Sequence, residues 1–376
     1  MIKLSHLFSA AMITSTAILS TGCGYDHSLI DASDERIKIS GRVVYETYDR
    51  HHGDFTRKET MAKWSYPGVT ISTKFIGSKI TMLAKPHSGY FMVEVDGKDR
   101  KKIGFTETSY EDRIVLADSL DKNQIHSVKV VYCDEGHELQ PEFHGFKTDG
   151  DLIKDETEKK NKFYFIGNSI TCGYGVDGDR SQTFNYETED FTKTFAYQIS
   201  EKYDAEYIVF AKSGYGIYRN YGDVKEGSSV NMSTLYDYTL FCDTTYKWDH
   251  NSFKADVVFL NLGTNDTSED NYDIEKFKSA AKNFVAKIRT TNPGSKLVLM
   301  TGPMMHDKAL SDVMMTLDEI AFQMAKDGDD KVYRFNFTPD DGKFGYGTDW
   351  HPSAEKQKDM TKELSEFLEK HEIIIQ

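Results

Sequence analysis

Four short blocks of small and polar residues between positions 167 and 352 contain the groups that ester hydrolysis needs. The blocks are GNSITCGYG (167–175), KSGYG (212–216), GTND (263–266) and TDWHP (348–352); the first three follow apolar runs, and the last stands just before an amphipathic stretch. Hydrolysis of an ester requires a nucleophile, a base that takes its proton, and donors for the negative oxygen that forms in the transition state. A serine, a histidine, backbone amides and an asparagine amide supply all three.

Each of these groups has a predicted role. Ser169 is the candidate nucleophile, because a serine where a strand ends beside glycine presents its hydroxyl close to backbone amides. His351 is the candidate base, since imidazole titrates near neutrality. The backbone amides of Ser169 and Gly214 and the side-chain amide of Asn265 form the predicted oxyanion hole, and glycine at position 214 leaves room for close approach of the substrate oxygen. This chemistry predicts no metal and no cofactor.

Asp349, two residues before His351, is predicted to be the acid of a catalytic triad. Residues two apart in an extended chain point to the same side, so its carboxylate would reach the imidazole. The alternative is a backbone carbonyl in that place, which would make the enzyme a Ser–His dyad. Two aromatic residues are candidates for binding substrate: Trp350 either stacks on a pyranose ring or belongs to the core, and Tyr215 either lines the sugar site or is an ordinary loop ring.

The elements that must position these blocks alternate between short apolar runs and amphipathic stretches. Phe277, Ala281 and Phe284 lie at helical spacing, and Pro293 ends that helix. Strands and helices in alternation predict a parallel α/β sheet over 160–376, with ligands bound at the carboxyl ends of its strands. The expected strands are 163–166, 207–211, 257–262, 297–300 and 332–335; the expected helices are 195–203, 274–289 and 310–326, with a last helix after residue 352.

The first half of the chain follows a different pattern. Short β-rich runs at 69–75, 90–95 and 127–132 are separated by turn signals, with no helical period between them. This pattern predicts an antiparallel β-sandwich over 36–148. The charged stretch 149–162 is interpreted as a solvated linker between two domains.

The order of the four blocks resembles the SGNH (GDSL) hydrolase superfamily, and the residues of the first two blocks are similar more narrowly to carbohydrate esterase family two. That resemblance implies a jelly-roll domain joined to a flavodoxin-like, three-layer SGNH domain. It also implies removal of acetyl groups from plant polysaccharides such as xylan or glucomannan, at the 6-position of hexopyranosides. In the first half it rests on Gly41-Arg42, Trp64, Pro67-Gly68, Phe75, Gly77, Asp96-Gly97, His126-Ser127-Val128 and Phe143-His144-Gly145-Phe146.

Two positions depart from the common pattern of the superfamily. The residue three before the histidine, which is the acid in many members, is Thr348, and the residue before the nucleophile is Asn168 in place of the common aspartate. Family two includes members with an acid two residues before the histidine and members with none. Asn168 is interpreted as a residue that holds the turn, with activity retained.

The composition narrows the function classes. The 376 residues include 46 basic and 60 acidic side chains, and the formal net charge of −14 opposes binding to nucleic acid. The resemblance to carbohydrate esterase family two implies an acetylated polysaccharide or oligosaccharide as the partner. Two alternatives remain beside a polysaccharide deacetylase: an SGNH esterase for another acyl ester, and a carbohydrate-binding surface lipoprotein without activity. The intact set of serine, glycine, asparagine and histidine disfavours the second alternative.

The N-terminus predicts export. Lys3 precedes an uncharged, mostly apolar run from 7 to 19, and the segment ends in Gly22-Cys23, which resembles a bacterial lipobox. The expected signal peptide is 1–22, with a lipid at Cys23 as the membrane anchor and a place in the cell envelope; cleavage and secretion is the alternative. Three cysteines remain in the body of the chain, where Cys172 and Cys242 either form a disulfide or stay reduced.

Overall fold

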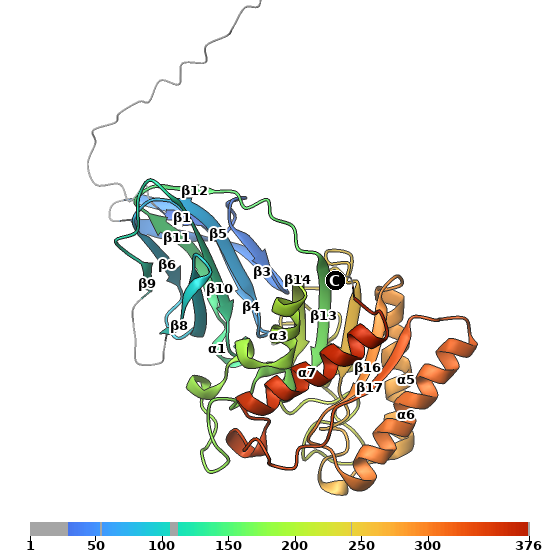
Figure 1. Ribbon diagram of the computed structural model, residues 1–376. Helices are drawn as coiled ribbons and strands as arrows, with labels where there is room; N and C mark the ends of the chain where they lie inside the picture. The colour runs from blue at the N-terminus through green and yellow to red at the C-terminus, as the bar shows by residue number, and fades with distance from the viewer. Residues whose placement is uncertain (1–28, 53–54, 106–111, 242, 375–376) are drawn as a thin grey trace, which may run out of the picture.

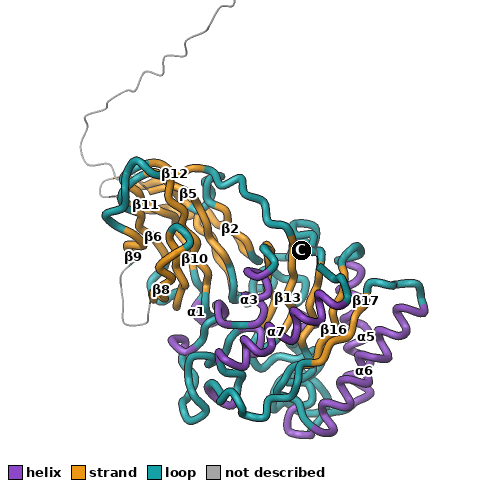
Figure 2. The backbone as a smooth tube through the Cα atoms, viewed as in Figure 1, coloured by secondary structure: helices purple, strands orange, loops and turns teal. Residues whose placement is uncertain are grey.

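The computed structural model describes residues 29–52, 55–105, 112–241 and 243–374. The predicted signal peptide 1–22, Cys23 and Cys242 lie outside these ranges. An all-β body precedes an α/β body along the chain (Figure 1), and Figure 2 shows the same division by secondary structure. The two-domain fold predicted from the sequence is confirmed.

Two antiparallel sheets face each other in the N-terminal body. Its elements are β1 (Leu29–Asp31), β2 (Lys38–Ser40), β3 (Val43–His52), β4 (Phe55–Trp64), β5 (Thr70–Ile76), β6 (Ile80–Ala84), β7 (Gly89–Val95), β8 (Lys98–Phe105), β9 (Arg113–Ala117), β10 (Ile125–Tyr132), α1 (Gly136–Leu139), β11 (Glu142–Thr148) and β12 (Asp151–Ile153). One sheet has the order β3-β4-β11-β6-β9 with β1 on β11, and the other has the order β12-β5-β10-β7-β8 with β2 on β5. Alternate residues of β5 and β7 are buried, as expected for strands with one face on a core.

The sandwich extends beyond the predicted range 36–148 at both ends. β1 pairs with β11, and β12 pairs with β5. The Asp149 carboxylate accepts hydrogen bonds from the backbone amides of Ser78 and Lys79 at 2.8 and 2.9 Å. Part of the charged stretch interpreted as a linker is therefore a strand of the sandwich, and the connection between the bodies is 154–160.

A five-stranded parallel sheet with the order β14-β13-β15-β16-β17 forms the centre of the C-terminal body. Helices α3 and α7 pack together on one face, and α5 and α6 cover the other (Figure 1). This is the predicted flavodoxin-like, three-layer arrangement. The elements are β13 (Asn161–Gly167), α2 (Ser169–Cys172), α3 (Phe195–Lys202), β14 (Ala205–Ala211), α4 (Met232–Leu235), β15 (Val257–Asn261), α5 (Ile274–Thr291), β16 (Lys296–Thr301), α6 (Asp307–Lys326), β17 (Val332–Asn336) and α7 (Ala354–Lys370), with short 3₁₀ turns η1 (Tyr186–Thr188), η2 (Phe191–Lys193), η3 (Ser268–Asp270) and η4 (Thr348–Trp350).

The sequence explains why the central strands are buried and where the helices begin. Every residue of β15 is buried, because helices cover both faces of the sheet. The rings of Phe165 and Phe259 stack between neighbouring strands at 4.8 Å. α5 begins where the Asp273 carboxylate accepts from two amides of the first turn, and it ends just before Pro293.

The two bodies are packed against each other through buried contacts. The fully buried Arg42 guanidinium donates hydrogen bonds to the carbonyls of Tyr236 and Tyr238, both at 2.8 Å, and lies 4.4 Å from the Phe210 ring centroid. Val131 of β10 belongs to the same apolar core as the strands of the parallel sheet. The sandwich is therefore in a position to contribute to a site on the α/β body.

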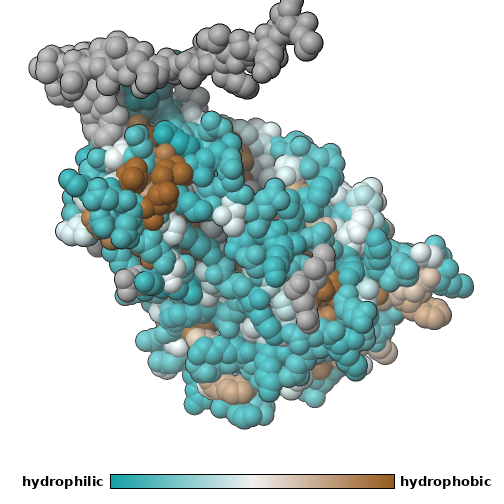
Figure 3. Space-filling model, turned by 45° about the horizontal axis from the view of Figure 1, so that its top comes forward, coloured by the Kyte–Doolittle hydropathy of each residue, from teal (hydrophilic) through white to brown (hydrophobic). Residues whose placement is uncertain are grey.

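The face drawn in Figure 3 is mainly hydrophilic, in keeping with the net charge of −14. Among the described ranges, no helix combines the length and apolar character needed to cross a bilayer.

Candidate active site

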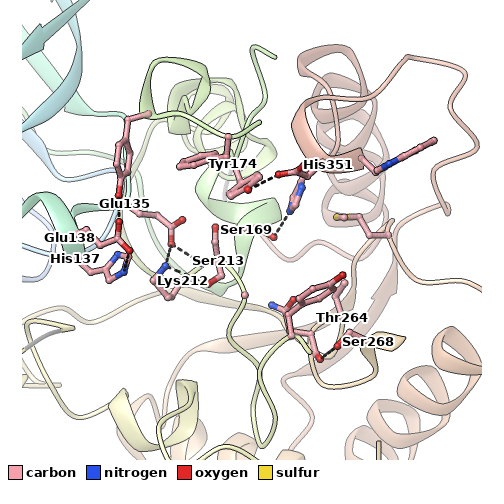
Figure 4. Close-up of a pocket in the computed structure, with 18 of the residues that line it drawn as sticks. Glu135, His137, Glu138, Ser169, Tyr174, Lys212, Ser213, Thr264, Ser268 and His351 are labelled. Carbon is pink, nitrogen blue, oxygen red and sulfur yellow. Dashed lines mark hydrogen bonds and ion pairs between the residues drawn. The ribbon is translucent and has the colours of Figure 1, made fainter. Parts of the chain in front are cut away.

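Ser169 and His351 meet at the carboxyl end of the parallel sheet. β13 ends at Gly167, and Ser169 begins the short helix α2. The Asn168 side chain caps this helix by accepting from the Ile170 amide at 3.1 Å, so it holds the turn that presents the serine. The Ser169 Oγ lies 2.8 Å from His351 Nε2 (Figure 4), although 182 positions separate the two residues in the sequence.

The second nitrogen of His351 defines which tautomer is present. Nδ1 lies 3.1 Å from the backbone carbonyl of Thr348. Because a carbonyl oxygen can only accept, Nδ1 carries the hydrogen and Nε2 is left to accept the Ser169 hydroxyl proton. Burial lowers the pKa of His351 below its usual value. The imidazole is thus neutral near pH 7 and able to act as a base.

The first and last blocks of the sequence are joined directly by hydrogen bonds. The Thr348 amide donates to the Gly175 carbonyl at 2.9 Å, and the Gly347 amide donates to the His351 carbonyl at 2.8 Å. A Cβ on Gly175 would lie 2.3 Å from the Thr348 Cβ, and its φ of +57° also favours glycine. The glycine at the end of the first block is therefore needed to dock the histidine loop.

Asp349 is not placed as predicted. Its φ is +50° and that of Trp350 is +63°, so the chain turns here and is not extended. The Asp349 carboxylate accepts from the Tyr174 hydroxyl at 2.8 Å, while the Tyr174 ring lies 4.3 Å from the imidazole ring. The position beside Nδ1 that the sequence suggested for this carboxylate is occupied by the Thr348 carbonyl. This is the arrangement of a Ser–His dyad, the alternative to the predicted triad.

The three predicted oxyanion donors lie around one cavity with Ser169. Within the described part of the chain, neither the Ser169 amide nor the Gly214 amide donates to another residue. Asn265 Nδ2 donates to the Tyr215 carbonyl at 2.8 Å, which leaves its second hydrogen available. A Cβ on Gly214 would meet no protein atom within 4 Å, so it is the φ of +78° that favours glycine there.

Asp266, next to Asn265, has a supporting role. Its fully buried carboxylate accepts from the amides of Ile217 and Tyr218, both at 2.8 Å. Burial raises the pKa of Asp266 to about 6, although these hydrogen bonds favour the ionised form. The residue holds the loop that follows the Gly214 turn.

The cavity has a volume of about 840 Å³ and is formed by both bodies (Figure 4). Glu135, His137 and Glu138 reach it from the segment around α1 of the sandwich, where Glu138 accepts from the Tyr186 hydroxyl at 2.9 Å. Its other lining residues are Ser169, Tyr174, Phe184, Tyr186, Lys212, Ser213, Gly214, Tyr221, Thr264, Asn265, Ser268, Glu269, Met304, Asp349, Trp350 and His351.

Two residues at the site carry no sequence signal as strong as that of the serine and the histidine. Glu135 belongs to the sandwich half of the chain, and nothing in its pattern connects it with the strand ends of the other domain. Tyr174 lies inside the first block, between two glycines. Its position in that block is the sequence feature that could have indicated its place beside the imidazole.

The two aromatic candidates for sugar binding have different positions. Trp350 lines the cavity with 55% of its surface exposed, and the Arg180 guanidinium lies 5.0 Å from its ring centroid, so it is a rim residue and does not belong to the core. The Tyr215 ring packs edge-on against Phe241 at 4.9 Å and is not among the lining residues.

Cys172 is a buried free thiol, and its predicted partner, Cys242, lies outside the described residues.

The geometry agrees with the comparison with known families. The GDSL-like Lipase/Acylhydrolase family matches residues 165–358, which are 194 of the 376 residues. The chain belongs to this family. A second match, Carbohydrate esterase 2 N-terminal, covers residues 53–154 and so lies in the sandwich. The first match confirms the predicted GDSL hydrolase family, and the second agrees with the predicted resemblance to carbohydrate esterase family two.

Relatives of this GDSL-family chain are carbohydrate esterases. Cellulase/esterase CelE of Acetivibrio thermocellus is 29% identical over 306 residues, covering 81% of this chain and 37% of CelE, so the chain spans little more than a third of that relative. An acetylxylan esterase / glucomannan deacetylase of Cellvibrio japonicus is 27% identical over 333 residues, covering 85% of this chain and 86% of the relative. A family two carbohydrate esterase from Clostridium thermocellum, solved in complex with cellohexaose, has a TM-score of 0.77 at 27% identity, covering 90% of this chain and 100% of that chain.

Proposed function

We propose that this protein is a serine esterase that removes O-acetyl groups from plant polysaccharides or oligosaccharides of the xylan or glucomannan type, with the 6-position of hexopyranosides preferred. The observation that carries the proposal is the 2.8 Å contact between Ser169 Oγ and a neutral His351 Nε2, in a cavity with three amide donors. The names of the family two relatives supply the substrate class.

The geometry supports an acyl-enzyme mechanism. Ser169 Oγ attacks the acetyl carbon while its proton passes to His351 Nε2, and the carbonyl oxygen becomes an oxyanion held by the amides of Ser169, Gly214 and Asn265. The bond from the carbonyl carbon to the sugar oxygen then breaks, and the imidazolium returns the proton to that oxygen. Water, deprotonated by His351, attacks the acetyl-serine; the bond from the acetyl carbon to Ser169 Oγ then breaks, the imidazolium returns the proton to Oγ, and acetate leaves. The Thr348 carbonyl keeps the hydrogen on Nδ1 throughout.

The cavity lining favours a sugar ester over a long acyl chain. Carboxylates, hydroxyls and amides surround Ser169, and aromatic rings such as Phe184, Tyr186 and Trp350 offer faces on which pyranose rings stack. Among the described lining residues, Met304 is the one large aliphatic side chain, whereas an extended acyl chain binds between several apolar side chains. The serine hydroxyl hydrogen-bonded to a neutral imidazole favours hydrolysis over carbohydrate binding alone.

One comparison tests the proposal. The purified protein should release acetate from 4-nitrophenyl acetate and from acetylated xylan or glucomannan, and should act far more slowly on a long-chain 4-nitrophenyl ester. S169A and H351A should each lose nearly all turnover, with the double variant little worse, because the two groups act as one unit. Wild-type turnover in S169A would overturn the mechanism. Activity restricted to the long-chain ester would favour another acyl substrate, and binding of glycan without hydrolysis would favour the inactive surface protein.

The proposal includes export. The apolar segment before Gly22-Cys23 supports processing at Cys23 with a lipid anchor, and accessible polysaccharide outside the cell is consistent with that location.

A further inference from the structure

The Gly214 amide is presented by a tight turn that is anchored from several sides. The Tyr215 amide donates back to the Lys212 carbonyl at 3.3 Å, and the positive φ of Gly214 gives the third position of a turn that requires glycine. The Lys212 amide bonds to the Gly167 carbonyl at 3.4 Å, close to the nucleophile, and the Gly214 carbonyl accepts from the Tyr221 amide at 2.8 Å. The position of the Gly214 amide depends on how firmly this turn is held.

One anchor of the turn comes from the other domain. Glu135, between β10 and α1 of the sandwich, accepts from the Ser213 amide at 2.6 Å through Oε1. The same oxygen lies 3.3 Å from Lys212 Nζ, so two successive residues of the turn bind one carboxylate oxygen (Figure 4). Glu135 and Lys212 are 4% and 8% exposed, which makes this a shielded contact and not a surface ion pair.

Glu135 is itself fixed by its neighbours. Its amide donates to the Glu189 carboxylate at 2.9 Å, and the next amide, of Gly136, donates to the Ser65 carbonyl at 3.0 Å. Burial raises the pKa of Glu135, but Lys212 and the Ser213 amide outweigh this effect, and the net pKa is lowered. The carboxylate is therefore ionised when it holds the turn.

We propose that Glu135 is a positioning residue of the esterase: by binding the Ser213 amide from the sandwich domain, it sets the Gly214 amide in the oxyanion hole. The sandwich would then contribute to the rate of the chemical step and would not act only as a scaffold or a sugar-binding module. This inference rests on the esterase function proposed above. A displaced oxyanion donor stabilises the transition state less, while binding of the ester in its ground state changes little.

The test separates the reach of the side chain from its charge. E135Q keeps an oxygen at the same distance and loses the charge; E135D keeps the charge and withdraws the oxygen by one methylene; E135A removes both. With 4-nitrophenyl acetate we expect kcat to fall roughly 10- to 100-fold in E135A and E135D, with KM within about twofold, since a displaced donor costs less than the 10²–10³ of a deleted one. E135Q should recover most of the rate. Inhibition by phenylboronic acid, which adds to Ser169 as a tetrahedral anion, should weaken in the same order.

A matched control tests domain docking alone. Lys129 and Glu201 form another ion pair between the two bodies, at 2.6 Å, and neither residue lines the cavity. E201Q should keep kcat, KM and boronate inhibition at wild-type values. Thermal unfolding of every variant shows whether it is folded, and if E135A is not, E135Q and E135D still decide the question.

The outcomes are distinct. Wild-type kcat in folded E135D or E135A would overturn the inference, and so would a loss of kcat in E201Q equal to that in E135D. A rate loss with unchanged boronate affinity would also overturn it, because that pattern reflects a smaller active fraction and not a displaced donor. A wild-type protein without hydrolysis would overturn the esterase function itself, before any variant is compared.

Discussion

The Tyr174 hydroxyl donates to the Asp349 carboxylate across 2.8 Å, and the same tyrosine ring lies against the imidazole of His351. Asp349 is thus bonded to the residue that packs on the base and not to the base itself. The carboxylate influences the imidazole at a distance, while the Thr348 carbonyl orients it by direct contact.

Replacing Asp349 should therefore cost little. In D349N the Nδ1 hydrogen bond to the Thr348 carbonyl is unchanged, so we expect kcat on 4-nitrophenyl acetate to fall less than about tenfold, against the ~10⁴ seen when a triad acid is lost. Y174F, which removes the other half of the contact, serves as the matched control and should behave alike. A loss of three orders of magnitude in D349N at every pH would restore Asp349 as the triad acid.

The pH dependence of activity should show that the pKa of the base, His351, lies below its usual value. The neutral imidazole is the active form, so activity is lost as pH falls through the pKa of His351, and burial lowers this pKa below the usual ~6.5. We expect kcat/KM for acetate release to be level from pH 8 to about 6.5, with the acid limb below it. Asp266, whose pKa is about 6, adds a second titrating group, which D266N would identify. A midpoint above 6.5 in both proteins would contradict the prediction.

The Asn265 side chain should contribute to the rate and not to binding. N265A removes one oxyanion donor, so we expect kcat to fall by about 10²–10³ with KM nearly unchanged. The variant also frees the Tyr215 carbonyl from its partner, and thermal unfolding should be measured beside the kinetics. A variant that raises KM and keeps kcat would assign Asn265 to ground-state binding.

The charge around the cavity should select neutral glycans. Glu138, Glu269 and Asp349 line it, whereas Lys212 is paired with Glu135. We expect kcat/KM for an acetylated neutral oligosaccharide to exceed that of a matched uronic acid-containing one by about three- to tenfold at low salt, and the ratio to shrink at 0.5 M NaCl because salt screens exposed charges.

E269Q isolates one of these charges. It should lower the preference for neutral glycans, and E319Q, on the exposed side of α6, should leave it unchanged. Equal preference in wild type and E269Q at low salt would show that shape and not charge sets the selectivity.

Cys23 gives a test of location that does not depend on catalysis. If Cys23 is lipidated, the wild-type chain expressed in a bacterial host should be labelled by palmitate and fractionate with membranes, and C23A should be released. An unlabelled wild-type chain found in the medium would favour ordinary cleavage and secretion.

The sequence predicted the fold and the region of the site because those signals are local. Apolar runs followed by polar blocks identify strand ends, and parallel strands bring their ends together, which places Ser169 and Asn265 near each other without further information. The helix expected at 274–289 was within two residues of α5, because its apolar spacing and Pro293 mark it clearly.

The remaining features depend on contacts between distant segments. Asp349 has a positive φ in the loop that docks on Gly175. The residue types next to it in the sequence do not predict this turn. Glu135 approaches the site only because the sandwich packs onto the α/β body. The strand β12 was hidden because it is a three-residue edge strand inside a charged stretch whose composition is that of a solvated linker.

The distribution of the site along the chain has a consequence for how activity is acquired. Its parts come from residue 135 in the first domain, residue 169 at the start of the second, and residue 351 just before the last helix. Contacts between such distant positions form late, since a long loop must close before they are gained. During refolding, secondary structure should therefore recover before hydrolysis does. A chain that is still being synthesised and does not yet include His351 should not hydrolyse esters, so acetate release reports that the site is assembled.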